Sequence, residues 1–385
     1  MSIKTLSKKM LAIVAAGAMT MGLAMPTSVF AAEGDTTAKV TEAYISKTFN
    51  TEVRKDETFS FKAEQVEGNT AQVEGNTAQV TIPDISFTDS ETGSKTKRAK
   101  VTFPEEWPDA GKYEYTVTET GASPAITDTK HQTMIMSQAE YTMDVYVSNV
   151  GNKLEISNII VNKKKDDKGQ TKTGKVDISD TDANGFKFTN TYVQEAGTGT
   201  DPTNPDPTYG KDGSLNVTKK IVANGATTVD TDKDFDFTAT FTFPTGTDAN
   251  TLGGVKDANG NKITINEGGT YTFKLKANGN MKFTGVPVGT QISVAESATP
   301  NYRGSAESVF NGQTQTQVSA SKYNEAITVT NTLGQKQNKV DVTNTYNYVP
   351  TTGIIMNNLP YVLMIALCGA ALMAFVAFKR RSLQK

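Results

Sequence analysis

Lysine, glutamate and asparagine, whose side chains can react to form an amide cross-link, occur twice along this chain in the same order. Each lysine lies near the start of its half, each glutamate closes a β-like run, and each asparagine stands in a Thr-Asn-Thr-Tyr sequence. Three matched landmarks in the same order indicate a divergent duplication. The two sets are Lys47, Glu119 and Asn190 in the first half and Lys219, Glu296 and Asn344 in the second.

Strand alternation places both lysines on an apolar face. Successive side chains of a strand point to opposite sides, so Ile45, Lys47 and Phe49 share one side, as do Val217 and Lys219. Burial disfavours charge, which lowers the pKa of a lysine and raises that of a glutamate. A neutral amine beside a protonated acid can attack a carboxamide carbonyl and expel ammonia. The predicted product is an uncharged amide bond between two side chains.

Two neighbouring residues compete for roles in the second set. Asn331 is an alternative to Asn344, and Asn344 is preferred because Phe188-Thr-Asn-Thr-Tyr192 ends the first half in the same way. Lys220 adjoins Lys219, but alternation points it outward. The competing interpretation is that the lysines and glutamates are ordinary strand residues facing solvent.

Short alternating runs rich in Thr, Val, Ile, Tyr and Phe fill the chain between its two ends. Examples are Tyr113–Glu119, Tyr141–Val147 and Ala326–Thr330, and turn sequences such as Asn184-Gly185 and Asn278-Gly279 separate the runs. Many short strands between such turns predict antiparallel β-sandwiches. The predicted fold class is all-β, with two tandem sandwich domains.

A polar, Pro-rich segment divides the predicted domains. Residues 194–213 cannot form a core of their own and are predicted to be a semi-rigid linker between domains at 32–193 and 214–347.

A short exact repeat lies in the first predicted domain. Gln65–Ala71 is repeated directly as Gln72–Ala78, which indicates a tandem insertion in a surface loop.

The N-terminal segment has the pattern of a secretory signal peptide. Three lysines precede an apolar run from Met10 to about Met25, and small residues end it at Ala31-Ala32. Such a segment is removed on secretion and takes no part in the fold. The predicted signal peptide spans residues 1–31.

The C-terminal residues 348–385 carry three motifs in order. Val349-Pro350-Thr351-Thr352-Gly353 is followed by an apolar run, Tyr361–Phe378, and by Lys379-Arg380-Arg381. The run is 18 residues long (378 − 361 + 1), about the minimum for a membrane-spanning helix. The arrangement resembles the sorting signal of Gram-positive cell-wall-anchored proteins, with Val349 in place of the usual leucine. The resemblance implies cleavage by a sortase between the last two residues of the pentapeptide; a simple C-terminal membrane anchor is the alternative.

Composition excludes several other functions. The one cysteine, Cys368, lies in the C-terminal apolar run, so the mature protein is predicted to have no disulfide, thiol nucleophile or Cys-bound metal. The one histidine, His131, is expected at the surface or in a turn and outside any catalytic triad. A net charge of −2, without an arginine-rich patch, argues against nucleic-acid binding. Asp180 and Asp182 resemble the start of a calcium loop, but Thr191 stands where the closing glutamate belongs, so no metal is predicted.

The lysine, the glutamate-ending strand and the closing Phe-Thr-Asn resemble the isopeptide-linkage domains of streptococcal-type, sortase-assembled pilins. This resemblance covers almost all of residues 37–346. It implies immunoglobulin-like sandwiches in which Lys47 bonds to Asn190 with the help of Glu119. It implies in the same way a bond from Lys219 to Asn344, or alternatively to Asn331, assisted by Glu296.

The resemblance implies a structural subunit of a surface pilus, covalently polymerised, anchored to the cell wall and strengthened by internal bonds. Its expected partners are a sortase, neighbouring pilin subunits and peptidoglycan, and a host surface ligand is a further candidate. It is expected to contact the membrane only before sorting. Lys163, Lys164 and Lys165 are the candidate acceptors for polymerisation, although the Tyr-Pro-Lys motif of other backbone pilins is absent. The alternative is a monomeric wall-anchored adhesin or a minor pilin at the tip or base. The internal reaction is a single turnover, so no enzyme and no cofactor are predicted.

Overall fold

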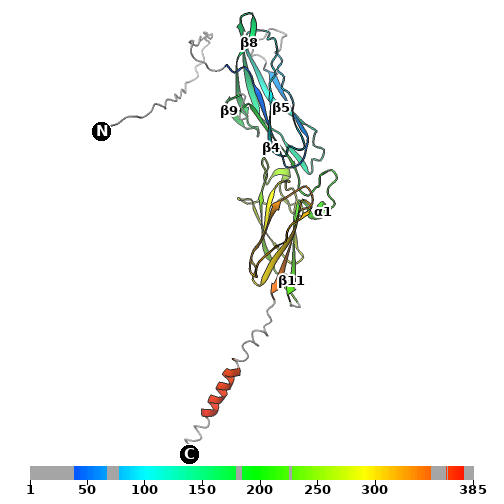
Figure 1. Ribbon diagram of the computed structural model, residues 1–385, viewed down its shortest axis with the longest axis vertical. Coiled ribbons are helices and arrows are strands. Elements are labelled where there is room, and N and C mark those ends of the chain that lie inside the picture. Colours follow the sequence, from blue (N-terminus) through cyan, green and yellow to red (C-terminus); the bar gives the residue numbers. More distant parts are fainter. Residues whose placement is uncertain are drawn as a thin grey trace, which may run out of the picture. The chain divides into compact units, whose positions relative to one another are not determined.

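The computed structural model describes residues 39–66, 78–178, 184–224, 228–347, 361 and 363–376. Figure 1 shows that strands make up most of this part of the chain. The predicted signal peptide, the sorting pentapeptide, the basic cluster after the apolar run and the acidic residues Asp180 and Asp182 lie outside the described residues. So does most of the tandem heptapeptide repeat.

The first sandwich is built from a four-stranded and a six-stranded sheet. Their strand orders are β4-β1-β10-β6 and β3-β2-β5-β7-β8-β9. The strands are β1 (Tyr44–Thr51), β2 (Glu57–Gln65), β3 (Ile85–Phe87), β4 (Gly93–Lys100), β5 (Gly111–Ser123), β6 (Gln132–Ile135), β7 (Glu140–Val150), β8 (Lys153–Lys165), β9 (Thr171–Val176) and β10 (Phe186–Gln194).

The second sandwich has the same two-sheet plan. Its strand orders are β14-β11-β20-β16-β17, with β18 also pairing with β16, and β13-β12-β15-β19. The strands are β11 (Leu215–Asn224), β12 (Phe235–Thr242), β13 (Thr270–Leu275), β14 (Asn280–Phe283), β15 (Gln291–Glu296), β16 (Tyr302–Phe310), β17 (Gln313–Thr314), β18 (Val318–Ser319), β19 (Ile327–Thr332) and β20 (Lys339–Asn347). Two short helices, α1 (Tyr209–Asp212) and η1 (Thr251–Gly253), accompany these strands. The predicted all-β class is confirmed.

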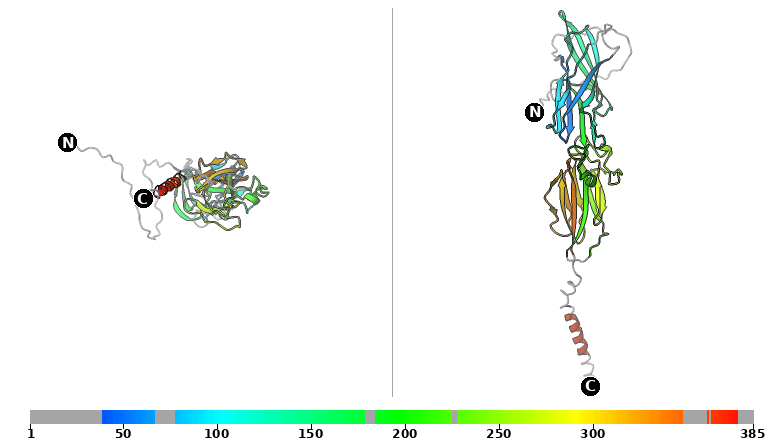
Figure 2. Two further views of the ribbon diagram at one scale, coloured as in Figure 1. Left: turned by 90° about the horizontal axis from the view of Figure 1, so that it is seen from below. Right: turned by 90° about the vertical axis from the view of Figure 1, so that its right-hand side faces the viewer.

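The sequence predicted antiparallel sandwiches, and one pair of neighbouring strands in each sandwich runs parallel instead. The first and last strands of each sandwich, β1 with β10 and β11 with β20, are neighbours that run parallel. Figures 1 and 2 show the ribbon of each pair side by side. Parallel neighbours cannot be joined by a tight hairpin, and here the whole of each sandwich forms the connection. This pairing brings the start and the end of each domain together, which local turn sequences cannot predict.

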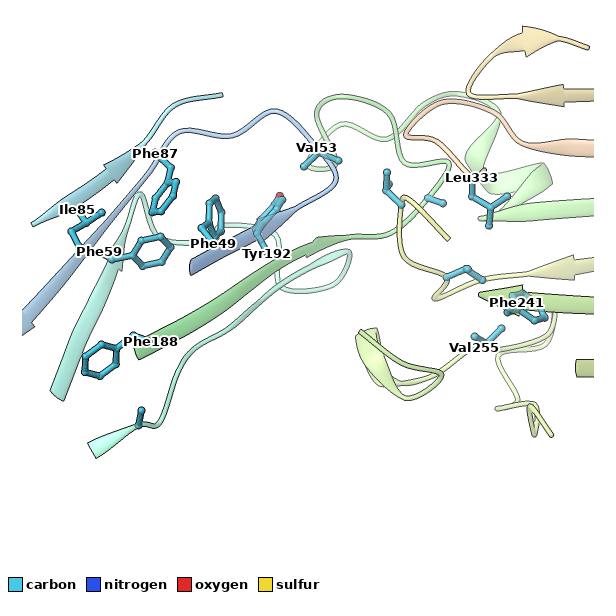
Figure 3. Packing of buried hydrophobic residues seen from close by; sticks show 14 of the residues in the cluster. Phe49, Val53, Phe59, Ile85, Phe87, Phe188, Tyr192, Phe241, Val255 and Leu333 are labelled. Carbon is cyan, nitrogen blue, oxygen red and sulfur yellow. The ribbon is translucent and has the colours of Figure 1, made fainter. Parts of the chain in front are cut away.

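Aromatic rings fill the space between the sheets of the first sandwich. Phe49, Phe59 and Phe87 form a mutually contacting group, with ring centroids 5.1 to 5.9 Å apart in tilted or edge-on arrangements (Figure 3). Rings prefer these offset geometries because the edge of one is attracted to the face of another. The second sandwich has a similar group around Phe273 and Phe283, with centroids 5.9 Å apart. Any polar side chain on these inner faces is therefore surrounded by apolar surface.

The segment predicted to be a semi-rigid linker, residues 194–213, is held in place by hydrogen bonds to the protein. The backbone N–H of Ala196 donates to Val286 at 2.8 Å, and that of Gly199 donates to Gln335 at 2.6 Å. The buried Glu195 carboxylate accepts hydrogen bonds from the Tyr209 hydroxyl, the Ser214 hydroxyl and a backbone N–H. These polar groups of residues 194–213 are thus paired with protein groups instead of water. The composition of the segment does not predict this pairing.

The C-terminal apolar run is helical where it is described, at residue 361 and residues 363–376. Within the described part of the chain, no helix is both long enough and apolar enough to cross a membrane.

Candidate functional site

The parallel strand pair positions the lysine and the asparagine of the first set. Lys47 lies in β1 and Asn190 in β10, and the register pairs Lys47 with Phe188 and Phe49 with Asn190. Lysine and asparagine are therefore two positions apart on adjacent strands. Because side chains alternate along a strand, both point to the same side of the sheet. Glu119 reaches them from β5, which belongs to the opposite sheet.

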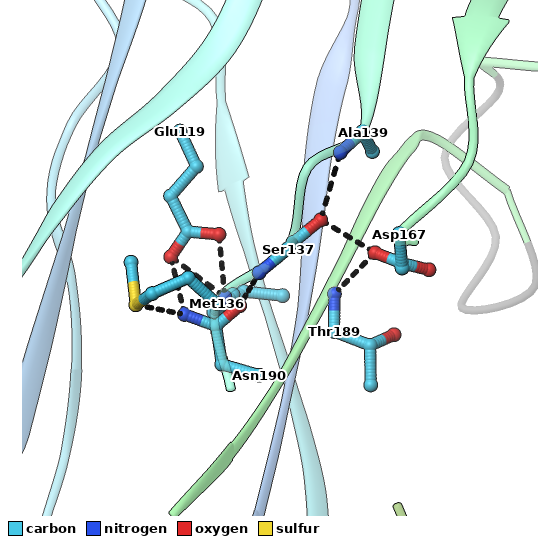
Figure 4. Close-up of polar contacts among 8 residues, drawn as sticks. Glu119, Met136, Ser137, Ala139, Asp167, Thr189 and Asn190 are labelled. Carbon is cyan, nitrogen blue, oxygen red and sulfur yellow. Dashed lines mark hydrogen bonds and ion pairs between the residues drawn. The ribbon is translucent and has the colours of Figure 1, made fainter. Parts of the chain in front are cut away.

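The three side chains of the first set meet in the core. The Lys47 ammonium Nζ lies 2.8 and 2.9 Å from the two carboxylate oxygens of Glu119. The Asn190 amide Nδ2 donates to Glu119 Oε1 at 2.6 Å (Figure 4). The side chains of Lys47 and Glu119 are fully buried, and so is Asn190. The glutamate thus contacts both the amine and the nitrogen that would leave.

Burial controls the charge of this pair. Desolvation lowers the pKa of Lys47 to about 8, although the neighbouring carboxylate opposes the shift. Desolvation also raises the pKa of Glu119, against the attraction of the lysine. The Lys47 Nζ lies 4.0 Å from the centroid of the Phe59 ring, so the amine is surrounded by apolar surface as well. Both shifts lower the cost of moving a proton from the ammonium to the carboxylate, and such a transfer would leave a nucleophilic amine.

The second set repeats the first in the same register. Lys219 in β11 pairs with Val342 of β20, and Asn344 is again two positions further along. Lys219 Nζ donates to Glu296 Oε1 at 2.7 Å, and Asn344 Nδ2 donates to the same oxygen at 2.6 Å. Glu296 comes from β15 in the opposite sheet.

The pKa shifts of the second lysine and glutamate have the same directions as those of the first. Burial lowers the pKa of Lys219 to about 8 and raises the pKa of Glu296. The centroid of the Phe235 ring lies 4.1 Å from Lys219 Nζ, in the place that Phe59 occupies in the first set. Two distant parts of the chain therefore build the same arrangement of charges and rings.

The two residues that competed for roles lie elsewhere. Asn331 is in β19, partly exposed, and its Oδ1 accepts a hydrogen bond from the backbone N–H of Thr332 at 2.8 Å. It pairs with Ile292 and does not contact Glu296. Lys220 is exposed, as strand alternation predicts. Asn344, not Asn331, is thus the carboxamide that contacts the second glutamate.

The three candidate acceptor lysines end β8 and differ in their surroundings. Lys163 is partly buried beside the Tyr141 ring, 5.2 Å from its centroid, and lines a hollow of about 280 Å³. Lys164 is exposed. Lys165 makes a 2.7 Å ion pair with Glu140.

His131 lies in a turn, one of the two expected positions, and its side chain is buried. Its Nδ1 lies 2.8 Å from Asp128 Oδ2, and the ring contacts Tyr209 edge-on. Its Nε2 has no hydrogen-bond partner among the described residues, so no nucleophile accompanies it there. In the same part of the chain, no three His, Cys, Asp or Glu residues are grouped so that they could hold a metal ion.

Sequence reasoning missed two residues of the first site. The backbone N–H of Ser137 donates to Asn190 Oδ1 at 2.7 Å, and the Ser137 hydroxyl donates to Asp167 Oδ1 at 2.5 Å. Neither residue belongs to the repeated Lys–Glu–Asn pattern. A backbone N–H can donate from almost any residue type, so the residue type at position 137 does not predict this contact. The matched halves of the chain therefore offered no signal for them.

Each of the two sandwiches matches a different protein family. Residues 43–193 match the family described as a Spy0128-like isopeptide containing domain, and residues 213–346 match a domain of unknown function, DUF7601. A comparison with curated proteins gave no match.

Several solved structures are similar in part. The major pilin protein T3.2 from Streptococcus pyogenes is 19% identical over 80% of this chain and 99% of its own, with a TM-score of 0.31. Another major pilin from the same organism is 19% identical over 80% of this chain and all of its own, with a TM-score of 0.32. A pilus-presented adhesin is 15% identical over 51% of this chain and 37% of its own, with a TM-score of 0.23. Residues 43–193 are therefore similar to the Spy0128-like isopeptide containing domain, and this match confirms the resemblance to streptococcal-type pilins.

Proposed function

We propose that each sandwich forms one internal isopeptide bond, from Lys47 to Asn190 and from Lys219 to Asn344. The observation that carries this proposal is the repeated geometry of a fully buried amine, a carboxylic acid and a carboxamide, with the acid 2.6 to 2.9 Å from both reactants in the first domain. The second domain repeats it at 2.6 and 2.7 Å. An ordinary buried ion pair needs no carboxamide in contact with the same oxygen.

The proposed reaction balances without an external reagent. The lysine ammonium gives a proton to the glutamate, and the neutral amine then attacks Cγ of the asparagine. The C–N bond to Nδ2 breaks, and the glutamate returns its proton to the departing nitrogen. The attacking nitrogen gives its second proton to the freed carboxylate, which passes it on to the departing ammonia. The products are a secondary amide and one ammonium ion, and the glutamate carboxylate is regenerated.

We further propose that the protein is a structural subunit of a sortase-assembled pilus anchored to the cell wall. The pilin-type domain supports this role, as do the sorting pentapeptide, the apolar run and the basic cluster in the sequence. In this proposal a sortase joins the Thr352 carbonyl to a lysine of the next subunit, with Lys163, Lys164 and Lys165 as candidate acceptors. The last subunit is transferred to peptidoglycan.

Intact mass of the purified full chain tests the internal bonds. Two bonds remove two ammonia molecules, so the mass should be about 34 Da below that calculated from the sequence. Peptide mapping should then recover one branched peptide from each domain. A mass equal to the calculated value refutes the cross-links.

Wall extracts run under denaturing conditions test polymerisation. A ladder of high-mass species is expected, and deleting Val349–Gly353 should release the protein into the medium. Replacing Lys163, Lys164 and Lys165 with arginine should abolish the ladder and leave wall-anchored monomer, because a guanidinium stays protonated and is a poor acyl acceptor. A wild-type chain that is anchored only as a monomer would instead be an adhesin or a minor pilin.

A further inference from the structure

The carbonyl oxygens of the two reacting asparagines differ in their hydrogen bonding. Asn190 Oδ1 accepts a hydrogen bond from the backbone N–H of Ser137 at 2.7 Å. Asn344 Oδ1 is buried and has no partner among the residues that the structure describes. In both sites the lysine amine and the asparagine Nδ2 contact one oxygen of the shared glutamate. The sites also differ at the other glutamate oxygen, because Glu119 Oε2 contacts Lys47 and Glu296 Oε2 has no partner among the described residues.

We propose that the Ser137 amide is an oxyanion donor for cross-linking in the first domain, and that Asp167 is the residue that positions it. This inference rests on the proposed isopeptide reaction. When the Lys47 amine adds to Cγ of Asn190, the carbonyl π electrons move to Oδ1, which becomes an oxyanion. An N–H group already directed at that oxygen stabilises the developing charge without reorganisation. When the oxyanion collapses, the C–N bond to Nδ2 breaks and ammonia leaves.

Asp167 holds the segment around Ser137, between β6 and β7, in place through several hydrogen bonds. Its Oδ1 accepts from the Ser137 hydroxyl at 2.5 Å and from the Thr189 backbone N–H at 2.9 Å. Its backbone carbonyl accepts from the Gln138 N–H at 3.0 Å. The Ser137 hydroxyl also accepts from the Ala139 N–H at 3.2 Å.

Figure 4 shows this network running from Asp167 through Ser137 to Asn190, with Thr189 attached to the same carboxylate. Thr189 precedes Asn190 in β10, so Asp167 connects the segment that carries the donor to the strand that carries the acceptor. The carboxylate thereby fixes the Ser137 N–H relative to Asn190 Oδ1.

Among the described residues of the second domain, none donates a hydrogen bond to Asn344 Oδ1. Gly304 of β16 is the register partner of Asn344, and a Cβ placed on it would lie 3.2 Å from Asn344 Oδ1. Removal of one oxyanion donor commonly slows an acyl transfer by about 10²- to 10³-fold. We therefore expect the first bond to form at least about tenfold faster than the second.

The test follows both bonds in one molecule. The full chain is isolated from inclusion bodies in urea, refolded by dilution and quenched with acid at intervals. Intact mass counts the bonds, and peptide mapping assigns each to its domain. In Asp167→Ala the first bond should form about tenfold more slowly or worse, while the second bond, an internal control, keeps its rate. Asp167→Asn keeps an Oδ1 acceptor for Ser137 and Thr189, so it should retain most of the wild-type rate.

A control separates positioning from folding. Asp167→Ala combined with Glu119→Ala, in which no first bond forms, should refold with the same far-ultraviolet circular dichroism as Glu119→Ala alone. Equal rates for Asp167→Ala and the wild type would overturn the inference, and so would an equal slowing by Asp167→Ala and Asp167→Asn. A second bond that forms as fast as the first would also overturn it. If the wild type forms neither bond, the proposed isopeptide function itself fails.

Discussion

Replacing Lys47 with methionine separates the effect of the covalent bond from that of a buried charge. Methionine has a similar length and fills the apolar space around Phe59, but it has no amine to attack Asn190. Glu119 remains, and its raised pKa favours the neutral form, which can still hydrogen-bond Asn190. In the cross-linked wild type the Lys47 nitrogen would be an uncharged amide, so the variant takes no charged partner away from Glu119. The measured change in stability should therefore report mainly the loss of the bond.

The magnitude follows from the length of chain that the bond closes. Lys47 and Asn190 are 143 positions apart (190 − 47). If the isopeptide bond acts as a disulfide does, closing such a loop in the unfolded chain stabilises the folded state by about 5 kcal/mol at 25 °C. For a domain of this size, that corresponds to a midpoint lower by roughly 10 to 20 °C in the variant. The matched variant Lys219→Met opens a loop of 125 positions (344 − 219), and nearly the same loss is expected in the second domain.

Differential scanning calorimetry together with intact mass is the appropriate assay. Lys47→Met should lose one ammonia instead of two, and the unfolding of the first domain alone should move to lower temperature. Lys219→Met should show the converse. The reasoning is refuted if Lys47→Met still loses two ammonia molecules, or if it loses one and unfolds at the temperature of the wild type.

Three other measurements test the chemistry of the sites. Glu119→Ala and Glu296→Ala should each raise the intact mass by about 17 Da relative to the wild type, because the shared acid is lost while both reactants remain; an unchanged mass would mean that the glutamate is not needed. Asn344→Ala should abolish the second bond, whereas Asn331→Ala should leave it intact, and peptide mapping distinguishes the two results. The cross-linking rate during refolding should fall as the pH rises through about 8, because the Lys–Glu pair then loses the one proton that it shares. It should also fall at acidic pH, where a second proton keeps the amine charged while the glutamate is protonated; a rate that rises steadily with pH would contradict this account.

The central residues of both sites could be predicted because their signals are local and repeated. Alternation along β1 puts Lys47 on the same side as Ile45 and Phe49, and all three are buried. The matched order of landmarks in the two halves then associates a glutamate and an asparagine with each lysine. The preference for Asn344 over Asn331 came from the same comparison, and the structure places Asn344 beside Glu296.

The remaining features depend on contacts between residues far apart in the sequence. The parallel pairing of β1 with β10 joins residues more than a hundred positions apart, and no turn sequence specifies it. The Ser137 N–H could not be found because every residue except proline has one. The order of residues 194–213 depends on the buried Glu195 carboxylate, whose partners Tyr209 and Ser214 come from further along the chain.

The parallel pairing of the terminal strands explains why a bond at this place would suit a load-bearing subunit. In the first domain the chain enters near β1 and leaves after β10, so tension applied to its two ends pulls these neighbouring strands in opposite directions. Hydrogen bonds between sheared strands can break, but a covalent bond from Lys47 to Asn190 would carry the load directly from one strand to the other. The residues between the two bonded positions, including most of the core, would then bear no tension. The same reasoning applies to Lys219 and Asn344 on β11 and β20, and it gives a mechanical reason for keeping the Lys–Glu–Asn set in both copies of the domain.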